Sequence, residues 1–203
     1  LLLFGLARAR GRTDPLTLLL VGVVFNAFAA AVVTFLKTVV CAAKAQEILF
    51  WLMGVIEVVP EEALLILGAY LLVGCTVLIP ASGALNLLST SDDEAAALGL
   101  PVERARLVTF LAAALLVGSV VAAAGMIGFV GLVVPHILRR LGGADHRFLV
   151  PAALLGGAIF LITADALARL TFYAFGTEVP VGVVTAFTGG PFFLALLLRR
   201  EAQ

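Results

Sequence analysis

Long apolar runs separated by short polar intervals dominate this chain. A membrane-spanning helix needs about 20 mainly apolar residues, because a helix satisfies its own backbone hydrogen bonds where no water is available. About six segments meet or approach this length, and we predict that each crosses a membrane: 15–36, 63–79, 107–124, 125–141, 148–168 and 179–198. The pattern therefore predicts an all-α fold, a polytopic transmembrane helical bundle.

Two of these segments depart from a simple span. Segment 125–141 has only about a dozen apolar residues, and its glycines and Pro135 favour a short or tilted helix packed against protein. Segment 179–198 is predicted to be broken by its glycines and prolines and to face protein or a water-filled cavity rather than lipid. Segment 46–54 carries interfacial aromatic residues and is expected to lie on the membrane surface.

The polar interval 85–106 carries the clearest local signals. Ser91 stands three residues before Glu94, the spacing of a capping box, and two aspartates add negative charge near the positive end of the helix dipole. Gly99 suits a helix C-cap, and Pro101 can occupy the first turn of the next helix. We predict one short helix, too short to cross a bilayer, which is either an ordinary connector or a docking element for a soluble partner.

The composition excludes an ordinary soluble domain. Hydrophobic residues make up 63% of the 203 residues and charged residues 13%, whereas soluble domains are about half apolar and a quarter charged. Lys plus Arg and Asp plus Glu are 13 each, so nothing in the balance points to a nucleic-acid partner. Cys41 and Cys75 lack a C-x-x-C or histidine neighbour, which predicts buried free thiols, and we expect no metal site and no catalytic residue.

The basic residues predict which side of the membrane each polar interval faces, because cytoplasmic loops are enriched in Lys and Arg. With six crossings, the side opposite the polar interval 85–106 holds Lys37, Lys44 and Arg169. The remaining ten of the 13 basic residues share the side of that interval, which we therefore predict to be cytoplasmic: Arg8, Arg10, Arg12, Arg104, Arg106, Arg139, Arg140, Arg147, Arg199 and Arg200.

Three motifs in order resemble one known family. ALNLLSTSDDEAAALGL, GMIGFVGLVVPHILRRLGGADHRFLVP and VPVGVVTAFTGGPFFLALLLRR are similar to the FecCD-type permease subunits of bacterial ABC importers for iron–siderophores, haem and vitamin B12. The resemblance covers essentially the whole chain. It implies that residues 1–203 form a single transmembrane permease domain, N-terminally truncated, with about six of the family's roughly ten helices and a short cytoplasmic coupling helix. The N-terminus, with apolar residues before basic ones, fits the tail of such a missing helix.

The resemblance also implies a function. The chain would be a membrane-spanning permease subunit that translocates an iron(III)–siderophore or related metal chelate across the bacterial cytoplasmic membrane. Its partners would be a second permease subunit, in a homodimer or heterodimer, two cytoplasmic ATPase subunits and a periplasmic or lipid-anchored substrate-binding protein. No phosphate-binding loop of the G-x-x-x-x-G-K-[ST] type occurs in the chain, so ATP would be used by the separate ATPase and no cofactor would be bound directly.

Three sets of residues are candidates for these roles. The resemblance assigns ATPase coupling to the polar interval, and the residues we select there are Leu85, Asn86, Ser91, Asp92, Asp93, Glu94, Leu98 and Gly99. The translocation pathway would involve Asn26, Gly189, Gly190 and Pro191. Arg169 would contact the binding protein.

Purely structural roles remain open for Asn26 and Arg169. Two other functions also remain open for the whole chain. Asn26 could make an interhelical hydrogen bond, and Arg169 could pair with Asp165 four residues earlier. An ion-coupled secondary carrier would place several ionisable groups at the midplane. An intramembrane enzyme would need paired acidic residues or a histidine pair within the membrane.

Overall fold

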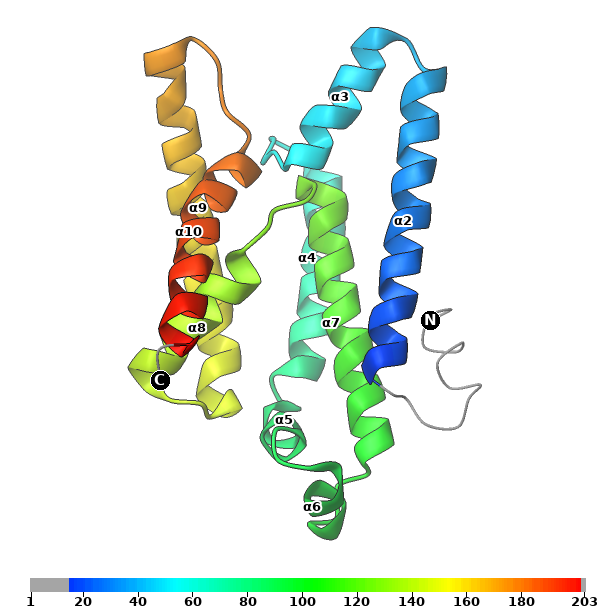
Figure 1. Ribbon diagram of the computed structural model, residues 1–203, viewed down its shortest axis with the longest axis vertical. Helices are drawn as coiled ribbons and strands as arrows, with labels where there is room; N and C mark the ends of the chain where they lie inside the picture. Colours follow the sequence, from blue (N-terminus) through cyan, green and yellow to red (C-terminus); the bar gives the residue numbers. More distant parts are fainter. Residues whose placement is uncertain (1–14, 202–203) are drawn as a thin grey trace. The chain divides into compact units, whose positions relative to one another are not determined.

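The computed structural model describes residues 15–201, and all regular secondary structure in that range is helical (Figure 1). The predicted all-α class is confirmed. The chain divides into two compact units, Leu1–Leu49 and Phe50–Gln203, so that the boundary falls inside α3 (Ala42–Met53). Three basic residues counted on the cytoplasmic side, Arg8, Arg10 and Arg12, lie outside the described residues.

The first unit contains α2 (Pro15–Val39) and the beginning of α3. The helix α2 begins at Pro15, as a first-turn proline allows, and its large apolar side chains, including Phe25, Phe28 and Phe35, are exposed in this chain. Such exposure is expected of a membrane helix whose apolar side chains contact lipid or another protein. On α3, Lys44 and Glu47 form an exposed ion pair of 2.7 Å.

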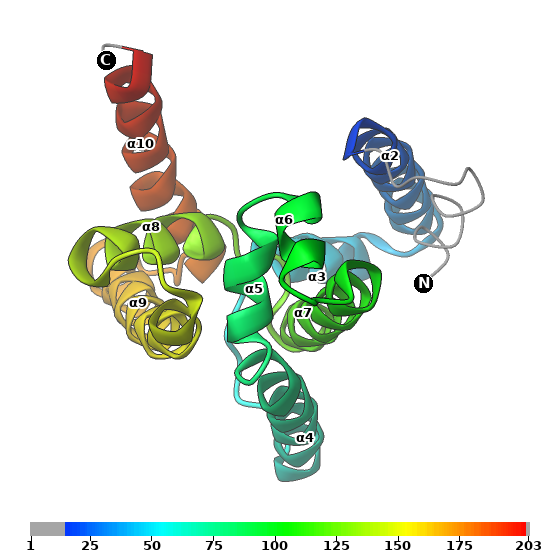
Figure 2. The same cartoon turned by 90° about the horizontal axis from the view of Figure 1, so that it is seen from below.

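The second unit contains seven helices after the end of α3. They are α4 (Glu61–Leu78), α5 (Ser82–Leu88), α6 (Asp92–Ala97), α7 (Val102–Ala124), α8 (Val130–Gly142), α9 (His146–Phe175) and α10 (Val181–Glu201). The helices α4 and α7 pack along each other, and α8, α9 and α10 pack together. The short helix α5 contacts both α7 and α9 (Figure 2). It therefore links the two groups of helices at one end.

Four helices in the described range are long and apolar enough to cross a membrane. They are Leu20–Val39, Glu61–Leu78, Val102–Ala124 and His146–Tyr173. A fifth apolar stretch, Val181–Leu196 in α10, is shorter. Five of the six predicted crossings thus have an apolar helical counterpart, four of them of spanning length.

The sixth predicted crossing, 125–141, differs from the expectation. Only 130–142 is helical, because residues 125–129 form a non-helical link and Phe129 adopts the left-handed conformation with φ 66° at the start of α8. At about 1.5 Å per residue, a helix of 13 residues is roughly 20 Å long. It is therefore shorter than the hydrocarbon layer of about 30 Å, and the prediction of a short helix packed against protein is confirmed.

The predicted break in the last segment, by contrast, is wrong, because α10 is one continuous helix with Pro191 inside it. Its glycines serve close packing instead. A Cβ at Gly189 would overlap the Cβ of Phe129, so this glycine makes room for the residue that begins α8. Gly189 is buried by this contact.

Three glycines bring three segments into backbone contact in the second unit. The amide of Gly182, at the start of α10, donates to the carbonyl of Gly54 at 3.2 Å, and the amide of Val55 donates to Ala124 at 3.0 Å. A Cβ at Gly182 would overlap the carbonyl oxygen of Met53, and one at Gly125 would overlap that of Trp51. We call Gly54, Gly125 and Gly182 the glycine junction. It holds the end of α7 and the start of α10 to the segment after α3.

The core beside this junction is small. Ala164 and Ala168 of α9 pack with Val181 of α10, and Ile56, Ile127 and Val184 complete the cluster. The expectation of buried thiols is wrong within this chain, because Cys41 is exposed and Cys75 only half-buried.

Candidate functional site

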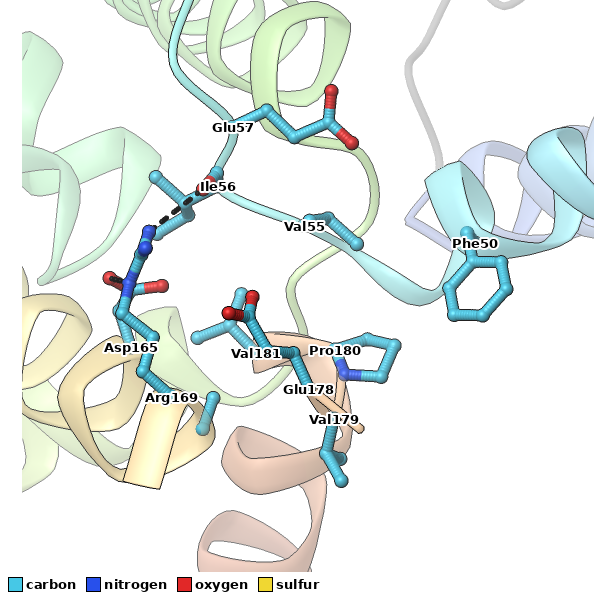
Figure 3. Close-up of a pocket in the computed structure, with 11 residues that line it drawn as sticks. Phe50, Val55, Ile56, Glu57, Asp165, Arg169, Glu178, Val179, Pro180 and Val181 are labelled. Carbon is cyan, nitrogen blue, oxygen red and sulfur yellow. Dashed lines mark hydrogen bonds and ion pairs between the residues drawn. The ribbon is translucent and has the colours of Figure 1, made fainter. Parts of the chain in front are cut away.

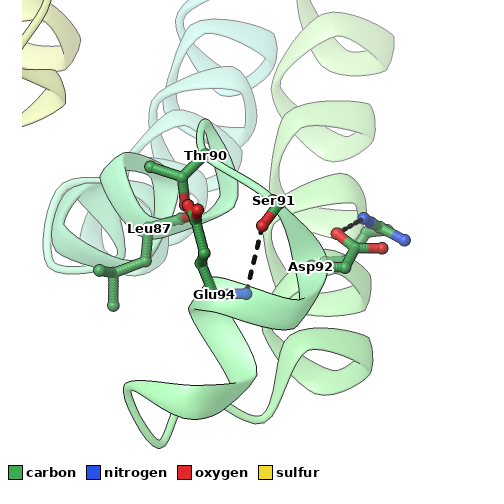
Figure 4. Close-up of polar contacts among 6 residues, drawn as sticks. Leu87, Thr90, Ser91, Asp92 and Glu94 are labelled. Carbon is green, nitrogen blue, oxygen red and sulfur yellow. Dashed lines mark hydrogen bonds and ion pairs between the residues drawn. The ribbon is translucent and has the colours of Figure 1, made fainter.

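The short helix α6 has the Ser91 N-cap that the sequence predicts, but within the described residues the Glu94 carboxylate does not complete the capping box by accepting from the amide of Ser91. The hydroxyl of Ser91 accepts a hydrogen bond from the amide of Glu94 at 3.2 Å (Figure 4). Acidic residues fill the first turn, and at the other end Gly99 has φ 85°, which only glycine adopts without strain. Pro101 differs from the expectation by one position, since it is the N-cap of α7 and not part of its first turn.

The polar interval contains a second helix that the sequence did not reveal. The prediction of one helix is wrong, because residues 82–88 form α5 directly before α6. The sequence gives little signal for α5, because seven residues are too few to show a clear helical periodicity of apolar positions. The helix also has no side-chain N-cap. What holds α5 is tertiary contact with α6, α7 and α9. The selected residues Leu85 and Asn86 lie on α5 and are half-buried.

The outer side of α6 is exposed, while its inner side is fixed to the protein. Ala95 is 0% exposed, whereas Leu98 is 69% exposed, and Ser91, Asp93 and Glu94 are exposed beside it. Asp92 accepts a hydrogen bond from the guanidinium of Arg106 on α7 at 2.6 Å (Figure 4). We call the exposed residues Ser91, Asp93, Glu94 and Leu98 the outer face of α6. A large apolar side chain among carboxylates on a rigid helix is suited to protein contact.

The α5–α6 element lies at the same end of the second unit as the start of α9. The side-chain oxygen of Asn86 accepts from the backbone amide of His146 at 2.8 Å, and Asn86 donates to the carboxylate of Asp145 at 2.6 Å. Asp145 is itself the N-cap of α9 and accepts from the amide of Arg147 at 2.9 Å. These contacts were not predicted, although an aspartate directly before a helix is a readable N-cap signal.

The distribution of charge along α9 agrees with a crossing. Arg147 lies in its first turn and Arg169 near its other end, about 33 Å apart at 1.5 Å per residue. That separation matches the hydrocarbon layer of about 30 Å. Arg139 and Arg140, in the last turn of α8, share the end of Arg147. The grouping of basic residues on the side of the α5–α6 element therefore holds for these arginines.

Arg169 lines a pocket of about 200 Å³ at the far end of α9 (Figure 3). Its guanidinium pairs with Asp165 at 2.7 Å, as the four-residue spacing predicts, and also donates to the carbonyl of Ile56 at 3.3 Å. The side chain is still 53% exposed. Glu57 and Glu178 line the same pocket and are exposed. The pairing with Asp165 is thus present and leaves part of the guanidinium free for a further contact.

The predicted pathway residues are divided between the two units. Asn26 is exposed on α2 in the first unit, and the structure gives its side chain no hydrogen-bond partner within the described residues. In α10, Gly189 is covered by Phe129, whereas Pro191 is exposed. Neighbouring α8 carries His136, whose ring packs edge-on against Phe192 at 6.1 Å between ring centroids. Within residues 15–201, no group of three His, Cys, Asp or Glu side chains could hold a metal ion.

These features define a class of protein. Several apolar helices of spanning length and basic residues grouped at one end are features of a polytopic membrane protein. The FecCD transport family model matches residues 1–199. The chain belongs to the FecCD transport family and is a multi-pass membrane protein of the ABC permease type.

Relatives with assigned names support this membership. The chain is 42% identical over 193 residues to the hemin transport system permease protein HmuU of Yersinia pestis, covering 95% of this chain and 57% of that protein. It is 41% identical over 195 residues to the vitamin B12 import system permease protein BtuC of Klebsiella pneumoniae, covering 96% and 58%. The Fe(3+)-citrate import system permease protein YfmD of Bacillus subtilis is 35% identical over 186 residues, covering 92% and 55%.

A solved structure has the same fold. It is described as an inward-facing conformation of a metal-chelate type ABC transporter, with a TM-score of 0.83 and 34% sequence identity over 98% of this chain and 62% of that one. The chain thus spans somewhat more than half the length of the curated relatives it matches.

Proposed function

We propose that this chain belongs to the permease subunit of an ATP-driven importer, and that the outer face of α6 is where a cytoplasmic ATPase binds. The observation that carries this proposal is the exposure of Leu98, 69%, on a helix whose two ends are capped and whose inner side is fixed. A rigid element transmits displacement, whereas a flexible loop absorbs it.

The charges of the element agree with this partner. The outer face offers two carboxylates, Asp93 and Glu94, beside Leu98. An apolar side chain surrounded by charged groups is the usual anatomy of a small protein interface, with a buried centre and a polar rim. We infer that the ATPase presents an apolar pocket for Leu98 with basic groups at its edge.

The cargo we propose is a metal chelate or a corrinoid, with an iron(III)–siderophore as one member of that class. Relatives named for hemin, vitamin B12 and Fe(3+)-citrate support the class and do not choose among its members. The transport unit would contain two permease subunits and two ATPases, with a binding protein that docks near Arg169. The free part of its guanidinium, next to the pocket of about 200 Å³, supports that last contact.

The docking proposal is tested in the complete permease, co-expressed with its ATPase. Leu98→Asp places a charge where an apolar contact is expected and should reduce co-purification of the ATPase at least about fivefold, since a central interface residue contributes about 1–2 kcal/mol or more. Leu141→Asp is the matched control, because Leu141 is 78% exposed and lies in the last turn of α8, outside the α5–α6 element. Unchanged co-purification with Leu98→Asp, or equal losses in both variants, would contradict a docking site on α6.

A further inference from the structure

One asparagine joins the α5–α6 element to the start of α9. The side-chain amide nitrogen of Asn86 donates to the carboxylate of Asp145 at 2.6 Å. Its oxygen accepts from the backbone amide of His146 at 2.8 Å and lies 2.7 Å from Nδ1 of the same residue. All three contacts connect residues about 60 positions apart in the sequence. They are long-range contacts between two helices and not part of the local capping of α5.

The chemistry of these partners fixes the arrangement of Asn86. A carboxylate only accepts hydrogen bonds, so the nitrogen of Asn86 must face Asp145, and its oxygen must face the backbone amide of His146. The Nδ1 atom of His146 then carries a proton and donates to the same oxygen. The pKa of Asp145 is lowered, first by the hydrogen bond from Asn86 and then by that from the amide of Arg147, so the carboxylate is charged at neutral pH. Asn86 thus makes a charge-assisted bond.

The element is held differently on its other side. The chain itself continues from α6 into α7, and the ion pair between Asp92 and Arg106 strengthens that connection. No direct covalent connection of this kind joins α5 to α9, because α6, α7 and α8 lie between them in the sequence. If α6 moves, α7 follows through the backbone. In contrast, α9 follows only through side-chain contacts, of which the three at Asn86 are polar and directional.

We propose that Asn86 is a positioning residue that makes α9 move together with α6, and that it does not itself contact the ATPase. This proposal rests on the proposed function, in which α6 binds the ATPase. The helix α9 also carries Arg169 at its far end, beside the pocket proposed for the binding protein. One continuous helix of 30 residues therefore runs from that pocket to the Asn86 contact, and binding on one side can alter ATP hydrolysis on the other.

The test uses the complete permease with its ATPase in lipid nanodiscs, and adds the cognate binding protein without chelate as the probe. With Asn86→Ala, co-purification of the ATPase and the basal rate of ATP hydrolysis should be retained. Stimulation of hydrolysis by the binding protein should fall about fivefold or more, the lower end of typical coupling between two sites. Thr90→Val is the matched control, because among residues 15–201 the one partner of its hydroxyl is the carbonyl of Leu87 at the end of α5.

A reciprocal exchange separates this role from a general loss of structure. Asn86→Asp alone sets two carboxylates against each other and should abolish stimulation. Combining it with Asp145→Asn removes this repulsion and lets the amide nitrogen of the new asparagine donate to the new carboxylate. Because the same oxygen of Asp145 also accepts from the amide of Arg147 at the start of α9, that cap is weakened and stimulation should recover only in part. Two results would overturn the proposal: loss of the ATPase with Asn86→Ala, or unchanged stimulation in that variant. Failure of the docking site itself would appear separately, as normal ATPase binding by Leu98→Asp.

Discussion

At the scale of single residues, the least ordinary position is Phe129. It is the one non-glycine residue with positive φ between 15 and 201, at 66°, and such a conformation costs a side chain about 1–2 kcal/mol. Packing compensates for this cost, because the ring of Phe129 lies against α10 at Gly189 and Gly190. A Cβ at Gly189 would overlap the Cβ of Phe129, whereas one at Gly190 would lie 3.9 Å from the far end of the ring, at ordinary contact distance. Two adjacent glycines therefore have different roles.

This difference gives a prediction for thermal stability. Gly189→Ala should destabilise the protein by about 1–3 kcal/mol, the usual cost of overpacking, and lower the unfolding midpoint in detergent. Gly190→Ala, the control, should be neutral or stabilising, because alanine favours a helix by up to about 1 kcal/mol over glycine. In a Phe129→Gly background the cost of Gly189→Ala should largely vanish, since the clashing atom is gone. Equal effects of the two alanine variants would refute the contact as the reason for Gly189.

At the scale of elements, α6 owes its boundaries to its own sequence. Removing the cap with Ser91→Ala should cost about 1 kcal/mol of local helix stability, and Ser91→Asp should retain it because a carboxylate also caps. Hydrogen exchange of the α6 amides measures this directly, with about fivefold faster exchange expected in the alanine variant, corresponding to that free energy. If exchange in α6 is unaltered by Ser91→Ala, the hydrogen bond to Glu94 does not hold the helix.

The sequence predicts some helices from local signals and misses others that depend on tertiary contacts. Local signals sufficed for α6, because Ser91 and Gly99 determine its ends without outside help. They failed for α5, which depends on contacts with α7 and α9, and for the glycines of α10, whose packing against Phe129 cannot be read from spacing. The candidate site was selected from its capping residues and the family resemblance, whereas the long-range contacts of Asn86 with Asp145 and His146 carry no signal in the sequence.

At the scale of the whole second unit, two groups of helices are joined at both ends by different means. At one end α5 packs against α7 and α9, and the side chain of Asn86 bonds the start of α9. At the other, the glycine junction brings backbones together: the amide of Gly182 donates to the carbonyl of Gly54, which has φ 79°, and Gly125 has φ 72°. Backbone contacts without side chains tolerate no added atom, so we expect this end to be the fixed one and the α5–α6 end to follow the ATPase.

Alanine substitutions test this arrangement. Gly125→Ala and Gly182→Ala should each prevent correct packing of the second unit, because the new Cβ would overlap a carbonyl oxygen of Trp51 or Met53 that cannot move without shifting the end of α3. The expected loss exceeds about 3 kcal/mol, since backbone displacement adds to overpacking, and should appear as aggregated protein in size-exclusion chromatography of the complete permease. Gly128→Ala is the control in the same link, with nothing within 4 Å of the added atom and no positive φ. Monodisperse protein from either junction variant, with ATP hydrolysis still stimulated by the binding protein, would mean that the junction can yield and is not the fixed end.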